Sequence, residues 1–272
     1  MDWMLVIALI ILFLDLFIPC SLYLLKNPLI LHKKKKLDFY SRHISHRGGA
    51  GEKIENTMEA FTHAEEVGTQ MLELDCHLTQ DGYVMVSHDK NLKRQTGLDV
   101  AISSLKRKDL PLYKDHLEVT FNVGHYSTGK DRKMALLEDV FKKFPKMPIN
   151  IEVKENKDEL IEKCPSMPYS FTMGRIFFLL VLFYTGLLPF VPLEESLLQF
   201  YLPSVINRKY IPEESILKNR FVSAVGQLGL FVCNEESDMD AAFSVGATGV
   251  MSDYPALLSE YLKNHPLPPS TM

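Results

Sequence analysis

The chain has 272 residues, of which 46% are hydrophobic and 24% are charged, so it is long enough to bury one large core. A formal net charge of -4 and a sequence pI near 6.1 argue against a nucleic-acid-binding protein, because no basic surface dominates the chain. The four cysteines at positions 20, 76, 164 and 233 form no CxxC pair, which predicts reduced thiols in a cytosol-facing domain.

The first predicted element is a membrane anchor within residues 1–36. Residues Trp3 to Leu25 are apolar apart from Asp15, and about 20 such residues suffice to span a bilayer. Because the start of the chain lacks the basic region and the cleavage site of a signal peptide, we expect the segment to be retained. Four lysines, Lys33 to Lys36, follow the span. They predict a single span with the rest of the chain in the cytoplasm, although a solvated linker is the alternative interpretation.

Short strands alternate with helices from residue 40 onward, as is typical of a parallel sheet covered by helices. We expect strands at 43–46, 71–75, 84–87 and 149–153, with a helix over 56–67 that stops at Gly68. Towards the other end, the pattern predicts a helix over 235–245, a strand within 246–255 and a helix over 257–262. This rhythm predicts a (β/α) barrel with one catalytic domain over residues 40–265.

A second apolar stretch interrupts the predicted barrel at residues 176–192, which read IFFLLVLFYTGLLPFVP. It is short for a membrane span and contains Gly186 and Pro189. We therefore interpret it as a re-entrant or interfacial segment that interacts with the membrane, and a buried core helix is the alternative.

Charged side chains follow the predicted strands, at the end of a barrel where active sites form. The first strand ends in His46 and Arg47, and an Arg guanidinium suits a phosphate because it donates paired hydrogen bonds. In the second strand Glu73 and Asp75 are two positions apart and face the same side. Two carboxylates on one inward face repel each other unless a cation lies between them, and oxygen ligands favour Mg²⁺ or Ca²⁺. An edge strand with a solvated acidic face is the alternative.

The third and fourth predicted strands add three more residues of the same kinds. His88 follows the strand at 84–87, and the strand at 149–153 carries Glu152 with Lys154 two positions further on. Each residue alone is more often structural. Their joint occurrence at four strand ends predicts a site that binds a divalent cation and a phosphate.

Three segments resemble the glycerophosphodiester phosphodiesterase family, whose signature combines HRG, ENT, ExD, HD and ExK. They are HISHRGGAGEKIENTMEAFTHA, MLELDCHLTQDGYVMVSHD and INIEVK. The anchor, the basic stretch and the LLPFVP segment are similar in particular to the membrane-anchored lysophospholipase D branch. The resemblance implies an acid/base pair of His46 and His88, metal ligands Glu73, Asp75 and Glu152, phosphate contacts from Arg47 and Lys154, and support of the first loop by Glu55 and Asn56.

The resemblance also implies a function. We expect metal-dependent hydrolysis of glycerophosphodiesters or lysophospholipids, using Mg²⁺ or Ca²⁺, with release of the head-group alcohol and lysophosphatidic acid or glycerol phosphate. We expect the bilayer and a lysophospholipid or glycerophosphodiester as partners, and a location at the endoplasmic reticulum or perinuclear membrane. A catalytically impaired pseudoenzyme or splice-type variant that binds lipid is the alternative. A phosphoinositide-specific phospholipase C relative is a third reading, which the ENT and ExD patterns do not support.

The chain departs from this family after Lys154. Only 13 residues, 155–167, precede residues 168–172 (PYSFT), which resemble the sixth barrel strand. Such a segment is too short for the two helices and one strand that a full barrel would place there. Residues 229–236 resemble the seventh-strand motif but lack its tryptophan, since the sole tryptophan is Trp3. We therefore predict an incomplete barrel that lacks the region of the fifth strand.

Overall fold

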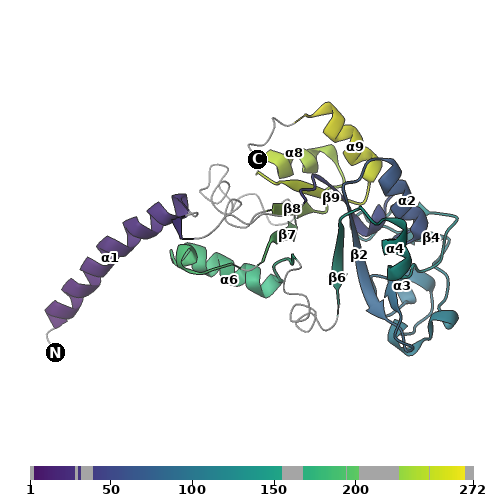
Figure 1. Ribbon diagram of the computed structural model, residues 1–272, viewed down its shortest axis with the longest axis horizontal. Coiled ribbons are helices and arrows are strands. Elements are labelled where there is room, and N and C mark those ends of the chain that lie inside the picture. Colours follow the sequence, from purple (N-terminus) through teal and green to yellow (C-terminus); the bar gives the residue numbers. More distant parts are fainter. Residues whose placement is uncertain are drawn as a thin grey trace. The chain divides into compact units, whose positions relative to one another are not determined.

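The computed structural model describes residues 3–27, 30–31, 39–154, 168–193, 195–201, 227–244 and 246–266 (Figure 1). The chain divides into two compact units. The apolar unit comprises Met1–Asp38, Pro168–Gln199 and Arg208–Leu228, and the barrel unit comprises Phe39–Met167, Phe200–Asn207 and Gly229–Met272. The predicted basic segment from Lys33 to Lys36 lies outside the described residues, as does Cys164. The described cysteines, Cys20, Cys76 and Cys233, are free.

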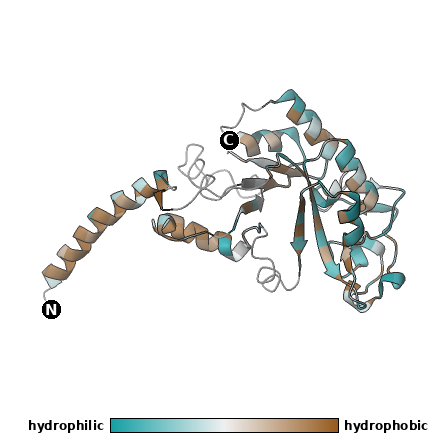
Figure 2. Ribbon diagram, in the orientation of Figure 1, coloured by the Kyte–Doolittle hydropathy of each residue, from teal (hydrophilic) through white to brown (hydrophobic). Residues whose placement is uncertain are grey.

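The apolar unit contains the predicted anchor as helix α1 (Trp3–Lys26). Its 24 residues are long and apolar enough to cross a membrane, and Figure 2 shows hydrophobic residues along its length. Helix α6 (Met173–Tyr184) and the 3-10 helix η5 (Leu188–Phe190) form the second apolar stretch. A helix of 12 residues rises only about 18 Å, so α6 is too short to span a bilayer.

Within the same unit, α1 contacts the segment that follows α6. The Ser21 hydroxyl donates a hydrogen bond to the Gly186 carbonyl oxygen at 2.6 Å, and the rings of Phe17 and Phe190 stack with centroids 6.0 Å apart. The predicted strand at 168–172 is wrong in extent, because only Ser170 forms an isolated bridge, with Leu197 of strand β7 (Leu197–Tyr201).

Five strands of the barrel unit lie side by side in the order β6, β2, β1, β9, β8, and every neighbouring pair is parallel. Their bounds are β1 (His43–Ser45), β2 (Met71–Leu78), β6 (Ile149–Val153), β8 (Gln227–Phe231) and β9 (Gly249–Ser252). The sheet curls as part of a barrel (Figure 1). Leu72 of β2 pairs with Ser45 on one edge and with Ile149 on the other, so β2 lies between β1 and β6. The predicted parallel sheet is therefore confirmed for these strands.

Strand β3 (Val84–Val86) corrects one prediction, because it runs antiparallel to β2 and is not a parallel barrel strand. The turn between β2 and β3 contains Asp81 and Gly82, a pair that favours tight hairpins. His88 nevertheless reaches the level of the acidic residues, since the backbone N–H of Ser87 donates to the Asp75 carbonyl oxygen at 2.9 Å.

Helices cover the outer face of the sheet. Their bounds are α2 (Met58–Glu66), α4 (Leu137–Lys143), α8 (Glu236–Ser244) and α9 (Pro255–Asn264). Thr57 caps α2 by accepting a hydrogen bond from the Ala60 N–H, and Gly68 with a φ of 97° follows its end. Leu72 and Leu74 face a core that includes Phe61 and Val140, so the alternate residues of β2 face the other side.

A long excursion connects β3 to α4 and carries short elements. They are α3 (Lys93–Thr96), η3 (Ile102–Ser104), η4 (Arg107–Asp109), and the strands β4 (His116–Glu118) and β5 (Tyr126–Thr128). Strands β4 and β5 pair as an antiparallel hairpin. The excursion has its own core, which includes Leu92, Ile102 and Tyr113.

Among the described residues the sheet ends at β6, and residues 155–167, where the fifth strand was predicted to be missing, lie outside them. In the part of the chain that the structure describes, β6 pairs with β2 and has no strand on its other edge. Residues of β6 are accordingly only partly buried, whereas nearly all of β2 is buried.

Candidate active site

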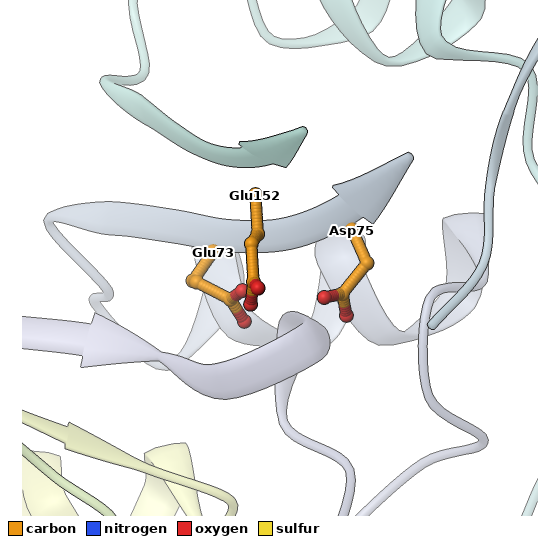
Figure 3. A group of neighbouring side chains, drawn as sticks. All are labelled: Glu73, Asp75 and Glu152. Carbon is orange, nitrogen blue, oxygen red and sulfur yellow. The ribbon is translucent and has the colours of Figure 1, made fainter. Parts of the chain in front are cut away.

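Three carboxylates converge on the inner face of the sheet (Figure 3). Glu73 and Asp75 project from β2, and Glu152 lies on β6 directly opposite Asp75 in the parallel register. One oxygen from each of the three lies within 4.8 Å of the others. The structure therefore brings together the three residues predicted as metal ligands.

The donors of this cluster fit a hard divalent cation. Burial raises the pKa of Glu73 to about 7, and the nearby negative charge of Asp75 adds to that effect. The side-chain oxygen of Asn56 is buried and has no hydrogen-bond partner, while its amide nitrogen lies 3.4 Å from Asp75 Oδ2. Carboxylate and amide oxygens are typical Mg²⁺ and Ca²⁺ ligands, and a cation would relieve the repulsion between the carboxylates.

Lys154 lies against two of the carboxylates. Its Nζ is 2.8 Å from Asp75 Oδ1 and 2.9 Å from Glu152 Oε1. Burial alone would lower the pKa of Lys154, but the attraction of Asp75 and Glu152 outweighs burial and raises it. The predicted phosphate contact is thus a protonated amine beside the acidic cluster. Lys154, which follows β6, and His88, which follows β3, line the same cavity of about 570 Å³.

Arg47 is held in a strained turn directly after β1. Its φ is 50°, and the next residue, Gly48, has a φ of 76° with no room for a side chain, since a Cβ there would lie 2.6 Å from the Phe61 ring. This turn directs the Arg47 backbone N–H to Glu73 Oε2 at 2.8 Å. The guanidinium is buried and donates to Glu55 Oε2 at 3.1 Å.

Glu55 is buried and joins the loop after β1 to the loop after β3 through ion pairs. Arg47 contacts Glu55 from one side, and Arg94 donates to both of its carboxylate oxygens, at 2.6 and 3.2 Å. Burial alone would raise the pKa of Glu55, but the two guanidinium groups outweigh burial and lower it to about 2. Arg94 also donates to Asp89 Oδ2 at 2.7 Å, and Asp89 Oδ1 lies 2.6 Å from His88 Nδ1. Glu55 thus contacts Arg47 of the first loop and is connected to His88 through Arg94 and Asp89.

His46 has a carboxylate partner from the far end of the chain. Its Nδ1 lies 2.6 Å from Asp253 Oδ1, and both side chains are buried. Burial alone would lower the pKa of His46, but the charge and hydrogen bond of Asp253 outweigh burial and raise it. Asp253 is itself oriented by Asn234, whose Nδ2 donates to Asp253 Oδ2 at 2.9 Å. With Nδ1 engaged, Nε2 is the atom of His46 that can exchange a proton with a substrate.

Sequence reasoning did not assign roles to Asp253, Asn234, Asp89 and Arg94. Asp253 follows the last strand, so the rule that active sites form at carboxyl ends of barrel strands could have found it. Asp89 adjoins His88 in the HD motif. Arg94 offers no comparable signal, because its contacts depend on the path of the loop after β3.

Comparison of the sequence with known families and proteins gives consistent findings. The sequence profile of the Glycerophosphoryl diester phosphodiesterase family matches residues 46–178. Human lysophospholipase D GDPD3 is 41% identical over 293 residues, which cover 90% of this chain and 92% of that protein. Human lysophospholipase D GDPD1 is 41% identical over 296 residues, covering 91% and 94%. These alignments are longer than the 272 residues of this chain, so the relatives contain segments that it lacks.

Solved structures share the fold. The glycerophosphoryl diester phosphodiesterase domain of a Mycobacterium tuberculosis protein superposes with a TM-score of 0.62 at 14% identity, covering 83% of this chain and 100% of that domain. A phosphodiesterase from Oleispira antarctica, solved with the product sn-glycerol-3-phosphate, gives a TM-score of 0.58 at 18% identity, covering 83% and 98%. The neighbours are TIM-barrel enzymes, which confirms the predicted fold class.

Proposed function

Because the chain belongs to the glycerophosphoryl diester phosphodiesterase family, we propose that it hydrolyses the phosphodiester of lysophospholipids or glycerophosphodiesters and releases the head-group alcohol. The observation that supports this proposal most strongly is the convergence of Glu73, Asp75 and Glu152 beside His46 and Arg47. Such a site combines oxygen ligands for a cation, positive charge for a phosphate and a buried imidazole for proton transfer.

The two histidines are the acid/base pair in this proposal. His46 and His88 each have a carboxylate 2.6 Å from Nδ1, which orients the ring and leaves Nε2 for proton transfer. His46 removes the proton from the attacking oxygen, which we take to be the free glycerol hydroxyl. The attack forms a cyclic phosphate and breaks the bond to the head group, whose alkoxide takes a proton from His88. Water then opens the cyclic phosphate with the two histidine roles reversed, which gives lysophosphatidic acid or glycerol phosphate.

The positive groups bind and orient the phosphate. A cation held by Glu73, Asp75 and Glu152, which we propose to be Mg²⁺ or Ca²⁺, would supply Lewis-acid stabilisation of the negative phosphate oxygens. Arg47 and Lys154 add fixed positive charge at the same cluster. Asn56, with its unpaired buried oxygen, lies beside Asp75 and helps to define this end of the site.

The membrane is the second partner that we propose. Helix α1 is long and apolar enough to anchor residues 40–265 to a bilayer, which suits an enzyme whose substrate is an amphiphile. The apolar segment at 176–192 supports interfacial binding, because α6 exposes Phe177 and Tyr184 and is too short to span. We place the catalytic domain on the cytoplasmic side because of the lysines that follow the span, and at the endoplasmic reticulum or perinuclear membrane because of the similarity to the membrane-anchored lysophospholipase D proteins.

The decisive experiment measures choline release from lysophosphatidylcholine by the detergent-solubilised full chain. We expect release that requires Mg²⁺ or Ca²⁺ and falls by at least about 100-fold in His46→Ala and in Glu73→Ala. Glu66→Ala is the matched control, because Glu66 is an exposed acid on α2. Release that is independent of the cation, or equal in all variants, would contradict the proposal.

A lipid-binding pseudoenzyme is the alternative, and the incomplete barrel is the observation that favours it. Glu152 stands on β6, which has no further strand on its outer edge among the described residues, and its side chain is 51% exposed. This alternative predicts a folded protein that binds lysophosphatidylcholine but releases no choline above the level of His46→Ala. Inositol phosphate production from phosphoinositides would instead favour a phospholipase C-type activity.

A further inference from the structure

The turn between β4 and β5 lies over the catalytic loop. We call residues 119–125 the hairpin tip. The hydroxyl of Thr120 accepts a hydrogen bond from Arg47 Nη1 at 3.1 Å, and the Phe121 ring meets the His46 ring edge-on, with centroids 5.6 Å apart. The tip therefore touches both residues of the first strand end that we place in catalysis.

Hydrogen bonds hold the tip in this position. Asn122 Nδ2 donates to the Tyr254 hydroxyl at 2.8 Å, and Tyr254 directly follows Asp253, the partner of His46. The turn itself is closed by a hydrogen bond from the Val119 N–H to the His125 carbonyl oxygen at 2.9 Å. The tip thus contacts both segments that build the His46 site, residues 46–47 and residues 253–254.

The tip and the first residue of β5 expose apolar side chains. Val123 is 83% exposed, Tyr126 58% and Phe121 40%. Turns of surface hairpins usually carry polar residues, so an exposed valine close in sequence to two exposed aromatic residues is a candidate contact for an apolar ligand. Because the same turn contacts His46 and Arg47, a molecule whose phosphate lies at those residues extends past these side chains.

We propose that Phe121, Val123 and Tyr126 bind the acyl chain of the substrate and so select lysophospholipids over water-soluble glycerophosphodiesters. This inference rests on the proposed function. An acyl chain suits the surface because it gains from contact with apolar side chains along its length. A cationic head group could contact the two aromatic rings but gains nothing from Val123, which is the most exposed of the three.

The first test compares two soluble substrates that share the choline head group. Octanoyl-lysophosphatidylcholine, kept below its critical micelle concentration, has an acyl chain, and glycerophosphocholine has none. We expect Val123→Ser to lower the ratio of kcat/KM on the acylated substrate to that on glycerophosphocholine by at least about fivefold. Phe141→Ser, an exposed position on α4, is the matched control and leaves the ratio within about twofold. An unchanged ratio in Val123→Ser would overturn the inference, and it would point to head-group contact if both activities fell together.

A second test does not depend on turnover. Since Trp3 is the only tryptophan, Val123→Trp in a Trp3→Phe background gives a single reporter on the tip. With Mg²⁺ present and His88→Ala added to prevent turnover, lysophosphatidylcholine carrying a brominated acyl chain should quench this reporter, and should not quench Phe141→Trp in the same background. Absence of quenching, or equal quenching by brominated phosphatidylcholine vesicles without lysolipid, would refute acyl-chain binding. If the wild-type chain hydrolyses neither diester, the proposed function fails while this measurement still decides about the tip.

Discussion

Replacing Asp253 with asparagine tests the electrostatic role that the structure gives to this residue. Asp253 accepts hydrogen bonds on both carboxylate oxygens, from His46 Nδ1 at 2.6 Å and from Asn234 Nδ2 at 2.9 Å. Asparagine offers only one acceptor oxygen, so it cannot serve both partners. A buried hydrogen bond to a charged group contributes about 1.5–3 kcal/mol, and losing that in the transition state corresponds to a decrease in kcat of about 10- to 150-fold.

The pH dependence gives an independent readout of the same change. Asp253 raises the pKa of His46 despite burial, so Asp253→Asn lets burial dominate and lowers that pKa. The pair stabilises the folded protein fully below the unfolded pKa of histidine, about 6.5, and this contribution is lost as the pH rises through the higher folded pKa. We therefore expect the loss of unfolding free energy in Asp253→Asn to be larger at pH 5.5 than at pH 9.

The assay combines choline release over a range of pH with urea unfolding followed by circular dichroism. Asp109 is an exposed acid on η4, so Asp109→Asn is the matched control. It should change the free energy of unfolding by no more than about 0.5 kcal/mol and leave the pH profile of choline release unchanged. A kcat within twofold of the wild-type value, together with an unchanged pH profile, would refute the proposed coupling between Asp253 and His46.

Three further predictions concern the acid cluster, the ion pairs and the first loop. The pKa of Glu73 is raised from 4.5 to about 7, so the stability of the metal-free protein falls as the pH rises between these two values. The gain in Tm from Mg²⁺ or Ca²⁺ should therefore grow between pH 5 and pH 8. A gain that is independent of pH would contradict this prediction. Arg94→Met leaves the buried Glu55 without this partner and should lower the free energy of unfolding in urea at pH 7 by about 3 kcal/mol. Lys93→Met breaks only the exposed pair with Asp99 and should lower it by less than about 1 kcal/mol. Equal losses in the two variants would refute the role of burial. Gly48→Ala should destabilise the protein by more than about 2 kcal/mol, because the new Cβ would overlap the Phe61 ring at a positive φ. Gly82→Ala, with a similar φ but open space, should cost about 1 kcal/mol, and equal thermal melts of the two variants would show that the Phe61 contact is unimportant.

The sequence was sufficient to predict the acid cluster because its geometry depends on local periodicity. Alternation along β2 places Glu73 and Asp75 on one face, and the parallel register sets Glu152 opposite Asp75. The direction of β3 was predicted wrongly, although Asp81 and Gly82 indicated a hairpin.

Contacts between distant segments could not be predicted in the same way. Asp253 lies 207 positions from His46, and nothing in the local pattern of either residue specifies the other. The hairpin tip reaches His46 through the folded path of a long excursion, so Phe121 carries no signal in the sequence. The prediction of a strand at 168–172 relied on resemblance alone, and the structure retains only the bridge at Ser170.

The order of the strands explains why an incomplete barrel retains every proposed site residue. Asp253 follows β9, His46 follows β1, Glu73 lies on β2 and Glu152 on β6, and these four strands are consecutive neighbours in the sheet. Among the described residues no strand lies beyond β6, and the strands that carry the acidic cluster and the His46–Asp253 pair are all present. At this edge of the cluster Glu152 is 51% exposed, while Asp75 is fully enclosed. The incomplete barrel should therefore affect cation binding at Glu152 more than proton transfer at His46.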